Sequence, residues 1–223
     1  INEKKEQVIS YDEADFSEGE VNLINQINHY LLRKNISLGE KDLIVDLGCG
    51  PGNISEKLAI KWPNTEVVGI DGSKEMILRA QYNKELSTDP KKLKNLRYIC
   101  SDIKDIKLTN CLLKKKISLL VSNSLIHHIT HLEDFFNTIK SMSSNITVNF
   151  HKDLKRPFDE KTALELKAKC SKKYNEILTT DYYASLRASY TFKELKNFTL
   201  KNDLSSLDVF EEGDNYLIVY GNV

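Results

Sequence analysis

Short apolar runs alternate with amphipathic segments along most of the chain. The runs have the length of buried strands, and the apolar residues between them recur at helical spacing. The predicted strands are 43–47, 66–70, 96–100, 117–122 and 146–150. Strands that alternate with helices predict a parallel sheet that is covered on both faces.

Helical spacing and capping residues predict where the helices begin. Helices are predicted at 20–32, around 54–62, after Ser73 and at 132–142, with a short helix expected between 100 and 117. Ser73 is placed to cap its helix, and Thr130 with Glu133 forms a predicted capping box ahead of 132–142. The helix 20–32 is expected to pack over the sheet edge or over the site.

The last third of the chain has a different pattern. Residues 152–188 are mostly helical and polar, and a second capping box, Thr191 with Glu194, opens another helix. Two strand-like runs, 207–210 and 216–220, follow with a short turn between them. Such a link requires antiparallel pairing, because a parallel return needs about a dozen residues or more. The fold class is therefore α/β: a doubly wound, mostly parallel seven-stranded sheet with helices on both faces and an antiparallel C-terminal hairpin.

Charge and cysteine content narrow the function. Lysine plus arginine and aspartate plus glutamate each total 32, so no net field attracts nucleic acid or an anionic membrane. The four cysteines have no CxxC spacing, which disfavours a disulfide framework or a zinc site. No apolar run approaches the roughly 20 residues that span a bilayer, and the charged start lacks the features of a secretory signal. We expect a soluble, cytoplasmic protein with no membrane or nucleic-acid partner.

The first predicted strand ends in a glycine-rich turn, DLGCGPG, at residues 46–52. Glycines at alternate positions let the backbone turn sharply and approach a ligand, and the next helix begins with unpaired N–H groups. An anionic group is expected there. The residues themselves leave open a dinucleotide phosphate, an amino-acid carboxylate or a tight turn without a ligand.

Polar residues follow the next three strands as well. The second strand ends at Asp71, where nucleotide-binding α/β folds place an acid that accepts hydrogen bonds from ribose hydroxyls. A plain helix-capping aspartate is the alternative, although Ser73 already occupies the cap position. The third strand ends at Ser101 and Asp102, and the fourth ends in SNSLIHH, residues 122–128.

The series DLGCGPG, GIDGS, CSDI and SNSLIHH resembles, in order and spacing, the motifs of class I S-adenosylmethionine-dependent methyltransferases. The resemblance covers residues 46–148 well. It implies S-adenosylmethionine as the cofactor, a Rossmann-like fold and methyl transfer as the activity. The glycines would line the methionine end, Asp46 would help hold its amino group, and Asp71 would bind the ribose.

The resemblance also implies roles at the remaining strand ends. Gly72 and Met76 would stack against adenine, Asp102 would bind its amino group with Ile103 beside it, and Asn123 would approach the methionine part or the methyl. The implied cofactor-binding residues are Asp46, Gly48, Cys49, Gly50, Gly52, Asp71, Gly72, Met76, Ser101, Asp102, Ile103, Asn123 and Ser124. A single domain, 1–223, is expected. It comprises an N-terminal helical cap at 1–40, a cofactor-binding core at 41–151, a helical insertion at 152–190 and a C-terminal helix with hairpin at 191–223.

A looser resemblance points to the small-molecule-type members of this superfamily. It rests on residues 153–157 and 185–191 and names no substrate. Arg156, Tyr11, Tyr182 and Tyr183 are candidates for binding the acceptor. Salt bridges for the arginine and surface packing for the tyrosines are the alternative interpretations.

His127 and His128 are the candidates for a general base, because a neutral imidazole is a suitable base near neutral pH. A base is needed only if the acceptor arrives protonated, as an alcohol, phenol or ammonium does. If both residues continued the strand, their side chains would point to opposite sides and at most one would face the methyl. The resemblance favours His128, and helix entry or packing is the alternative for both. A metal site with His131 lacks a carboxylate partner, so no metal is expected.

The leading hypothesis is methyl transfer to an O, N or C atom of an unidentified small molecule. An RNA or protein methyltransferase and a catalytically inactive cofactor-binding interaction protein are the alternatives, and a nicotinamide-dependent dehydrogenase is the least favoured. The oligomeric state is left open. The RNA alternative rests on Lys114, Lys115, Lys116, Lys152, Lys155, Arg156, Lys172 and Lys173.

Overall fold

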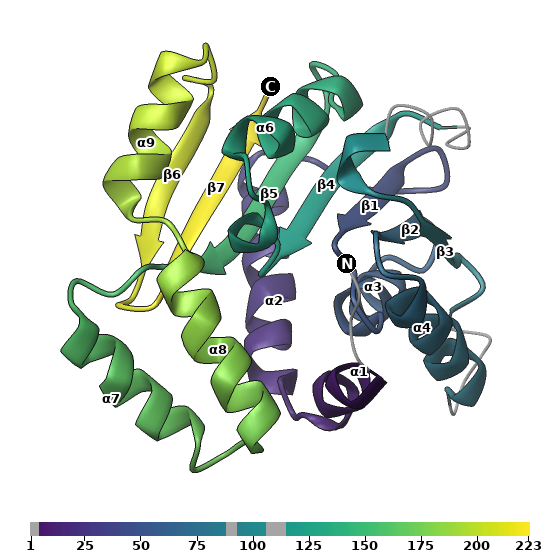
Figure 1. The fold of residues 1–223 in the computed structure, drawn as a ribbon. Helices are drawn as coiled ribbons and strands as arrows, with labels where there is room; N and C mark the ends of the chain where they lie inside the picture. The colour runs from purple at the N-terminus through teal and green to yellow at the C-terminus, as the bar shows by residue number, and fades with distance from the viewer. Residues whose placement is uncertain (1–4, 88–92, 106–114) are drawn as a thin grey trace.

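The computed structural model describes residues 5–87, 93–105 and 115–223, in which the strands form one seven-stranded sheet (Figure 1). The strands are β1 (Leu43–Leu47), β2 (Glu66–Asp71), β3 (Leu96–Cys100), β4 (Ile117–Asn123), β5 (Val148–Leu154), β6 (Leu207–Glu212) and β7 (Tyr216–Asn222). Their order is β3-β2-β1-β4-β5-β7-β6. The first five strands run parallel, and β7 lies antiparallel between β5 and β6. The predicted fold class is confirmed.

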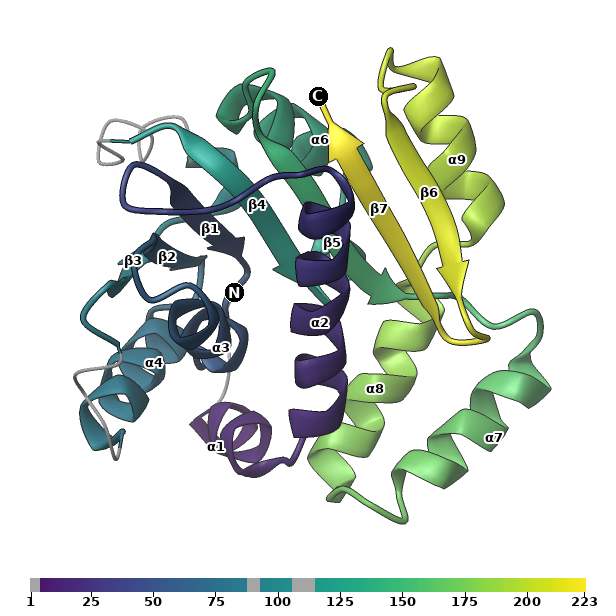
Figure 2. The ribbon, with the colours of Figure 1, turned by 180° about the vertical axis from the view of Figure 1, so that it is seen from behind.

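Helices pack on both faces of this sheet. They are α1 (Lys5–Glu13), α2 (Ser17–Arg33), α3 (Asn53–Lys61), α4 (Lys74–Leu86), α6 (Leu132–Met142), α7 (Glu160–Cys170), α8 (Glu176–Ala188) and α9 (Phe192–Lys201), with short 3-10 helices η2 (Ile103–Asp105) and η4 (Ile126–His128). Helices α6 and α9 lie over one face, and α2 and α3 cover the other (Figure 1, Figure 2). Helix α4 packs against β2 and β3.

Each face of the sheet has its own apolar core. On one side Phe135 and Phe136 of α6 are almost fully buried, with their rings edge to face. On the other side Leu23 and Ile27 of α2 and Leu58 of α3 have no exposed surface. Burying one such side chain contributes about 1.5–3 kcal/mol to folding, so the amphipathic helices hold the strand ends in place.

The carboxyl ends of the parallel strands point toward α1 and α8 (Figure 1). Gln7 of α1 donates to Asp181 of α8 with 2.7 Å between the atoms. Asp12 of α1 pairs with Arg79 of α4. Helix α1, which the apolar pattern did not predict, therefore connects the helix after β2 to the segment inserted after β5.

Strand β5 is longer than predicted. It continues to Leu154, so the helical insertion expected from residue 152 begins only with α7 at Glu160. The reason is pairing on both sides: β5 aligns with β4 through Lys152 and with β7 through Leu154. Polar side chains at these positions are buried in the sheet, where sequence polarity suggested a helix.

Two of the three predicted helix caps form. Ser73 accepts from Met76 N, and Thr191 with Glu194 makes the full capping box. The box predicted at Thr130 and Glu133 is wrong, because α6 begins after His131, which makes no side-chain cap hydrogen bond. The short helix expected between 100 and 117 is η2 in its described part, and residues 106–114, including Lys114, lie outside the described residues.

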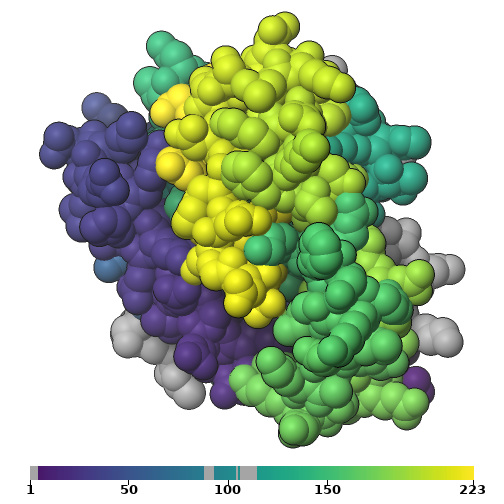
Figure 3. Space-filling model, turned by 90° about the vertical axis from the view of Figure 1, so that its left-hand side faces the viewer, coloured from purple at the N-terminus to yellow at the C-terminus, as the bar shows by residue number. Residues whose placement is uncertain are grey.

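The C-terminal hairpin forms one edge of the sheet. Figure 3 shows this side of the molecule, where the yellow hairpin lies between the purple N-terminal helices and the green segment that carries α7 and α8. Among the described helices, none is long and apolar enough to cross a membrane.

Candidate functional site

The glycine turn after β1 adopts a backbone that other residues rarely tolerate. Gly48, Gly50 and Gly52 all have positive φ, at 67°, 53° and 98°. A Cβ at Gly48 would lie 2.6 Å from Leu125, and one at Gly52 would lie 2.3 Å from the Tyr98 hydroxyl. The packing around the turn therefore requires glycine at these two positions.

Gly50 is different, because no described atom lies within 4 Å of where its Cβ would be. Its positive φ is needed for the turn, yet the space beside its Cα is open. The Gly50 N–H donates to Asp71 Oδ2 at 2.9 Å. An open backbone at the mouth of a glycine turn is where a ligand can approach the chain closely.

Asp71 connects the turn to the end of β2. Its other oxygen, Oδ1, accepts from Ser73 N at 2.8 Å, so each carboxylate oxygen already holds one backbone N–H. A carboxylate has about four acceptor sites, which leaves capacity for two further donors such as ribose hydroxyls. Burial raises the pKa of Asp71 above its ordinary value.

Asp46 is a buried acid beneath the turn. It is 1% exposed, and Ser55 Oγ donates to its Oδ2 at 2.6 Å. Burial, with Asp71 nearby, raises the pKa of Asp46 to about 7. Within the described parts of the chain neither acid forms an ion pair. A cationic ligand group placed here would restore the balance of charge.

The other predicted cofactor residues lie at neighbouring strand ends. Ser101 N donates to Asp71 O at 2.9 Å, which brings the end of β3 beside β2. Gly72 and Asp102 are exposed and Met76 is buried at the start of α4. Cys49, Ile103, Asn123 and Ser124 are placed in the glycine turn, in η2, at the end of β4 and directly after it. The predicted roles of these residues toward a cofactor stay predictions.

These observations fit S-adenosylmethionine as the group that the motifs imply. The open face at Gly50 suits close approach of a ligand, Asp46 suits an ammonium, and Asp71 suits vicinal hydroxyls. All three are features of the same turn and its neighbouring strand end.

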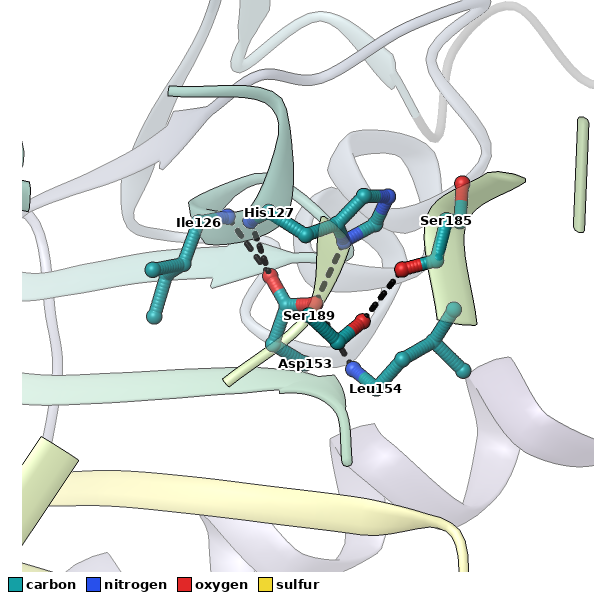
Figure 4. Close-up of polar contacts among 6 residues, drawn as sticks. All are labelled: Ile126, His127, Asp153, Leu154, Ser185 and Ser189. Atoms are coloured by element: carbon teal, nitrogen blue, oxygen red, sulfur yellow. Dashed lines mark hydrogen bonds and ion pairs between the residues drawn. The ribbon is translucent and has the colours of Figure 1, made fainter. Parts of the chain in front are cut away.

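His127 and His128 lie in η4 and do not continue β4. Their side chains therefore do not point to opposite sides: the ring centroids are 4.1 Å apart and the rings are tilted by 40°. His127 Nδ1 lies 2.5 Å from Asp153 Oδ1 (Figure 4). His128 is exposed, yet desolvation by the protein atoms around its ring, together with His127, lowers its pKa to about 4.

The four candidates for acceptor binding come from three parts of the chain: Tyr11 lies on α1, Tyr182 and Tyr183 lie on α8, and Arg156 follows β5. Tyr11 packs near Phe16 with ring centroids 6.4 Å apart. Tyr182 is half-buried on α8, and desolvation, with Tyr216 nearby, raises its pKa to about 12. Tyr183 donates to Glu160 of α7, and Arg156 pairs with Glu194 of α9.

Several basic residues of the RNA alternative are engaged in ion pairs. Lys152 is only 4% exposed and pairs with Glu212 at 2.5 Å, so it does not belong to a basic surface that could bind RNA. Lys155 contacts Glu211 at 3.3 Å. Among the described residues no group of three or more histidine, cysteine or acidic side chains is arranged to hold a metal ion.

Sequence reasoning assigned no role to Asp153 or Ser55. Asp153 is 3% exposed and was assigned to a helical insertion. The signal was present, because Asn149, His151 and Asp153 alternate with Val148 and Phe150 as residues of one strand do. Ser55 lies in the first turn of α3, and only the packing of that helix on β1 brings it to Asp46.

A glycine turn, an acid on the next strand and this sheet order define a class of proteins: Rossmann-like α/β enzymes that bind a nucleotide at the carboxyl edge of the sheet. A family model described as a methyltransferase domain matches residues 38–190. The chain belongs to this methyltransferase family, and the predicted recognition of a class I, S-adenosylmethionine-dependent methyltransferase is confirmed.

Short stretches of the chain are similar to curated enzymes. A trans-aconitate 2-methyltransferase from Azoarcus sp. is 44% identical over 50 residues, which are 22% of this chain and 20% of that protein. One from Afipia carboxidovorans is 50% identical over 38 residues, 17% of this chain and 15% of that protein. The matches thus span about a fifth or less of these relatives' own length.

Solved structures are similar over the whole chain. A SAM-dependent methyltransferase from Aquifex aeolicus has a TM-score of 0.66 and 16% identity, with 99% of this chain and 98% of that chain covered. The plantazolicin methyltransferase BamL, in complex with a triazolic desmethylPZN analog and SAH, has a TM-score of 0.72 and 17% identity, with 100% and 92% covered. At these identities the likeness shows the fold alone.

Proposed function

We propose that this chain transfers a methyl group from S-adenosylmethionine to an O, N or C atom of a small molecule. The observation that carries the proposal is the open glycine turn beside two acids, the buried Asp46 and the partly buried Asp71, that lack cationic partners among the described residues. The family match and the SAH bound to the BamL neighbour support the same cofactor.

The residues of the chain have mainly to bind and orient. When bound, the cofactor supplies a methyl on a sulfonium that is already activated for attack. Asp46 would hold the ammonium, Asp71 would accept from the ribose, and Gly50 would leave room for both. Orientation of two reactants can contribute on the order of 7 kcal/mol to catalysis. Helices α1 and α8, at the same edge, would exclude water.

A small-molecule acceptor is supported by the surroundings of the strand ends. Helices α1 and α8 are bonded to one another there, which favours an enclosed acceptor over a long polymer. The ion pairs of Lys152, Lys155 and Arg156 weaken the case for an RNA surface. The curated relatives act on trans-aconitate by name, and that substrate is a candidate to test for this chain.

Calorimetry with S-adenosylmethionine and S-adenosylhomocysteine tests the cofactor. We expect a Kd below about 1 mM, or about −4.1 kcal/mol. The Asp71→Asn variant should bind about 10–100-fold more weakly while it keeps the fold, because a charged acceptor is lost. Reduced nicotinamide dinucleotide serves as the control nucleotide. Binding of that control alone would replace this proposal with a dehydrogenase.

A further inference from the structure

Asp153 is a buried carboxylate that organises the turn after β4. Its Oδ2 accepts from Ile126 N at 2.6 Å and lies 3.4 Å from His127 N. Its Oδ1 accepts from Leu154 N at 2.7 Å and lies 2.5 Å from His127 Nδ1. Figure 4 shows these contacts converging on one side chain from two neighbouring segments. The position of this imidazole is therefore fixed by a residue 26 positions away.

The two nitrogens of His127 have different surroundings. Nδ1 faces the carboxylate, so it carries the proton in the neutral ring. Nε2 points away from Asp153 and, among the described residues, has no hydrogen-bond partner although it is buried. The side chain is 3% exposed. A buried ring nitrogen with a free lone pair is costly to leave unpaired, which points to a donor supplied by a ligand.

The location of the pair suits a reacting acceptor. Helix η4 follows the end of β4 after two intervening residues, and α8 packs against it. Asn123, the residue predicted to approach the methionine part or the methyl, is the last residue of β4, and Ser124 follows it directly. The pair is thus at the carboxyl edge, on the same side of the sheet end as the glycine turn.

We propose that His127, positioned by Asp153, takes the proton from an acceptor hydroxyl, so that the acceptor is an alcohol or phenol. This rests on the proposed methyl transfer. The hydroxyl O–H would donate to Nε2, and its proton would move to that nitrogen as the O–CH3 bond forms and the sulfonium C–S bond breaks. The imidazolium would be stabilised by Asp153, and the proton would then pass to solvent. A carboxylate acceptor is already ionised at neutral pH and needs no such base.

His128 is the competing base. Its low pKa, about 4, makes it a weak proton acceptor, and no described carboxylate is bonded to it. Among the described residues, His127 contacts the titratable groups Asp153 of β5 and His128 of η4. Tyr190, after α8, interacts with Asp153 in turn, and burial together with acids that include Asp153 raises the pKa of this tyrosine. His128→Asn is therefore the matched control variant for His127→Gln.

The first experiment is nitrogen-15 NMR of histidine-labelled protein, which needs no acceptor. We expect His127 as the Nδ1–H tautomer with an unprotonated Nε2, and a loss of that preference in Asp153→Asn. His128→Asn should leave the His127 signals in the same tautomer. An Nε2–H tautomer in the wild-type protein would overturn the proposal. Asp153→Asn removes several hydrogen bonds and could fail to fold. In that case His127→Gln identifies which NMR signals belong to His127, and the tautomer is read from the wild-type protein.

The second experiment follows labelled methyl transfer to catechol and benzyl alcohol, with trans-aconitate and benzoate as carboxylates. We expect hydroxyl compounds to be methylated and His127→Gln to lower kcat about 10²–10⁴-fold, with little change in His128→Asn. Affinity for S-adenosylhomocysteine should be unchanged. Added imidazole should partly restore the activity of His127→Ala. The fall of kcat at acidic pH that the wild-type enzyme shows should be absent in His127→Gln.

The outcomes separate the two proposals. Absence of cofactor binding would overturn the proposed function, whereas the NMR experiment would still test whether Asp153 sets the tautomer of His127. Methylation of carboxylates only, or of no hydroxyl compound in the panel, would overturn the acceptor class. Full activity of His127→Gln would show that the histidine has a structural role alone.

Discussion

The glycine-turn region and the Asp153–His127 region lie at the same edge of the sheet, but they are built in different ways. The turn is local: Gly48 to Gly52 and Ser55 follow β1 within one short stretch, and Asp71 ends the next strand along. In the second region, His127 contacts Asp153, which is 26 positions away in the sequence. At the same edge, Gln7 bonds Asp181 across 174 positions. The predicted cofactor-binding residues therefore come from contiguous motifs, whereas the proposed acceptor chemistry depends on how distant segments meet.

The two regions also differ in charge. The turn region holds two acids without cationic partners among the described residues, and burial raises the pKa of both. In the second region Asp153 is surrounded by four N–H groups or ring nitrogens, which satisfy its oxygens. This difference is consistent with the proposal that the turn binds a cationic ligand group, whereas Asp153 already has its hydrogen-bond partners within the protein.

Asp46→Asn is expected to give the largest effect on the turn region. Cofactor affinity should fall about 10–100-fold, because a charged hydrogen bond is lost. Stability should rise by about 2 kcal/mol at pH 8. The folded-state pKa of about 7 exceeds the ordinary 3.8. Asp46 therefore destabilises the folded state increasingly as the pH rises from about 4 to about 7, because the unfolded chain ionises first. The gain should shrink as pH falls toward 4, as measured by urea unfolding; a loss of stability at pH 8 would contradict it.

Gly50→Ala tests whether the open face of the turn binds a ligand. Gly213 in the hairpin turn is the matched control, because both glycines have positive φ and no described atom near a built Cβ. Each change to alanine should cost about 1 kcal/mol of stability from backbone strain. Only Gly50→Ala should weaken cofactor binding, by about tenfold or more, in calorimetry. Equal binding by both variants would mean that the turn is structural.

Cofactor affinity should depend on pH through Asp46. An ammonium ligand favours the ionised carboxylate, so affinity should fall as pH drops below about 7 and level off above it. Between pH 8 and pH 6 we expect roughly a tenfold loss, since one pKa unit corresponds to 1.36 kcal/mol. The same titration in Asp46→Asn should be flat. A steep dependence retained in that variant would assign the effect to another group.

Asp12→Asn is expected to give the smallest effect. Its contacts with Arg79 and Asn83 lie near the surface, so the free energy of unfolding should change by at most about 1 kcal/mol. Hydrogen exchange should nevertheless increase in α1, which those contacts hold against α4. Unchanged hydrogen exchange would show that the contact between α1 and α8 is enough to hold α1 in place.

Much of the fold and of the turn region could be predicted from the sequence. The strand-to-turn signals for β1 and β2 and the cap at Ser73 depend on neighbours within a few residues, and the structure has each of them. The prediction failed where polarity conflicted with burial. Lys152 and Asp153 look like surface residues, yet an internal strand buries both and supplies an ion pair to one and hydrogen bonds to the other.

The histidines show the same division. Their presence after β4 was visible, but their relative orientation was predicted from strand geometry and η4 overrides it. The amino-acid order alone determined the glycine turn, the acids beside it and the alternation of strands and helices, because these follow from short-range backbone preferences and periodicity. Only the tertiary structure decided that β7 lies between β5 and β6 and that Asp153 meets His127, because strand register and packing set the contacts between distant residues.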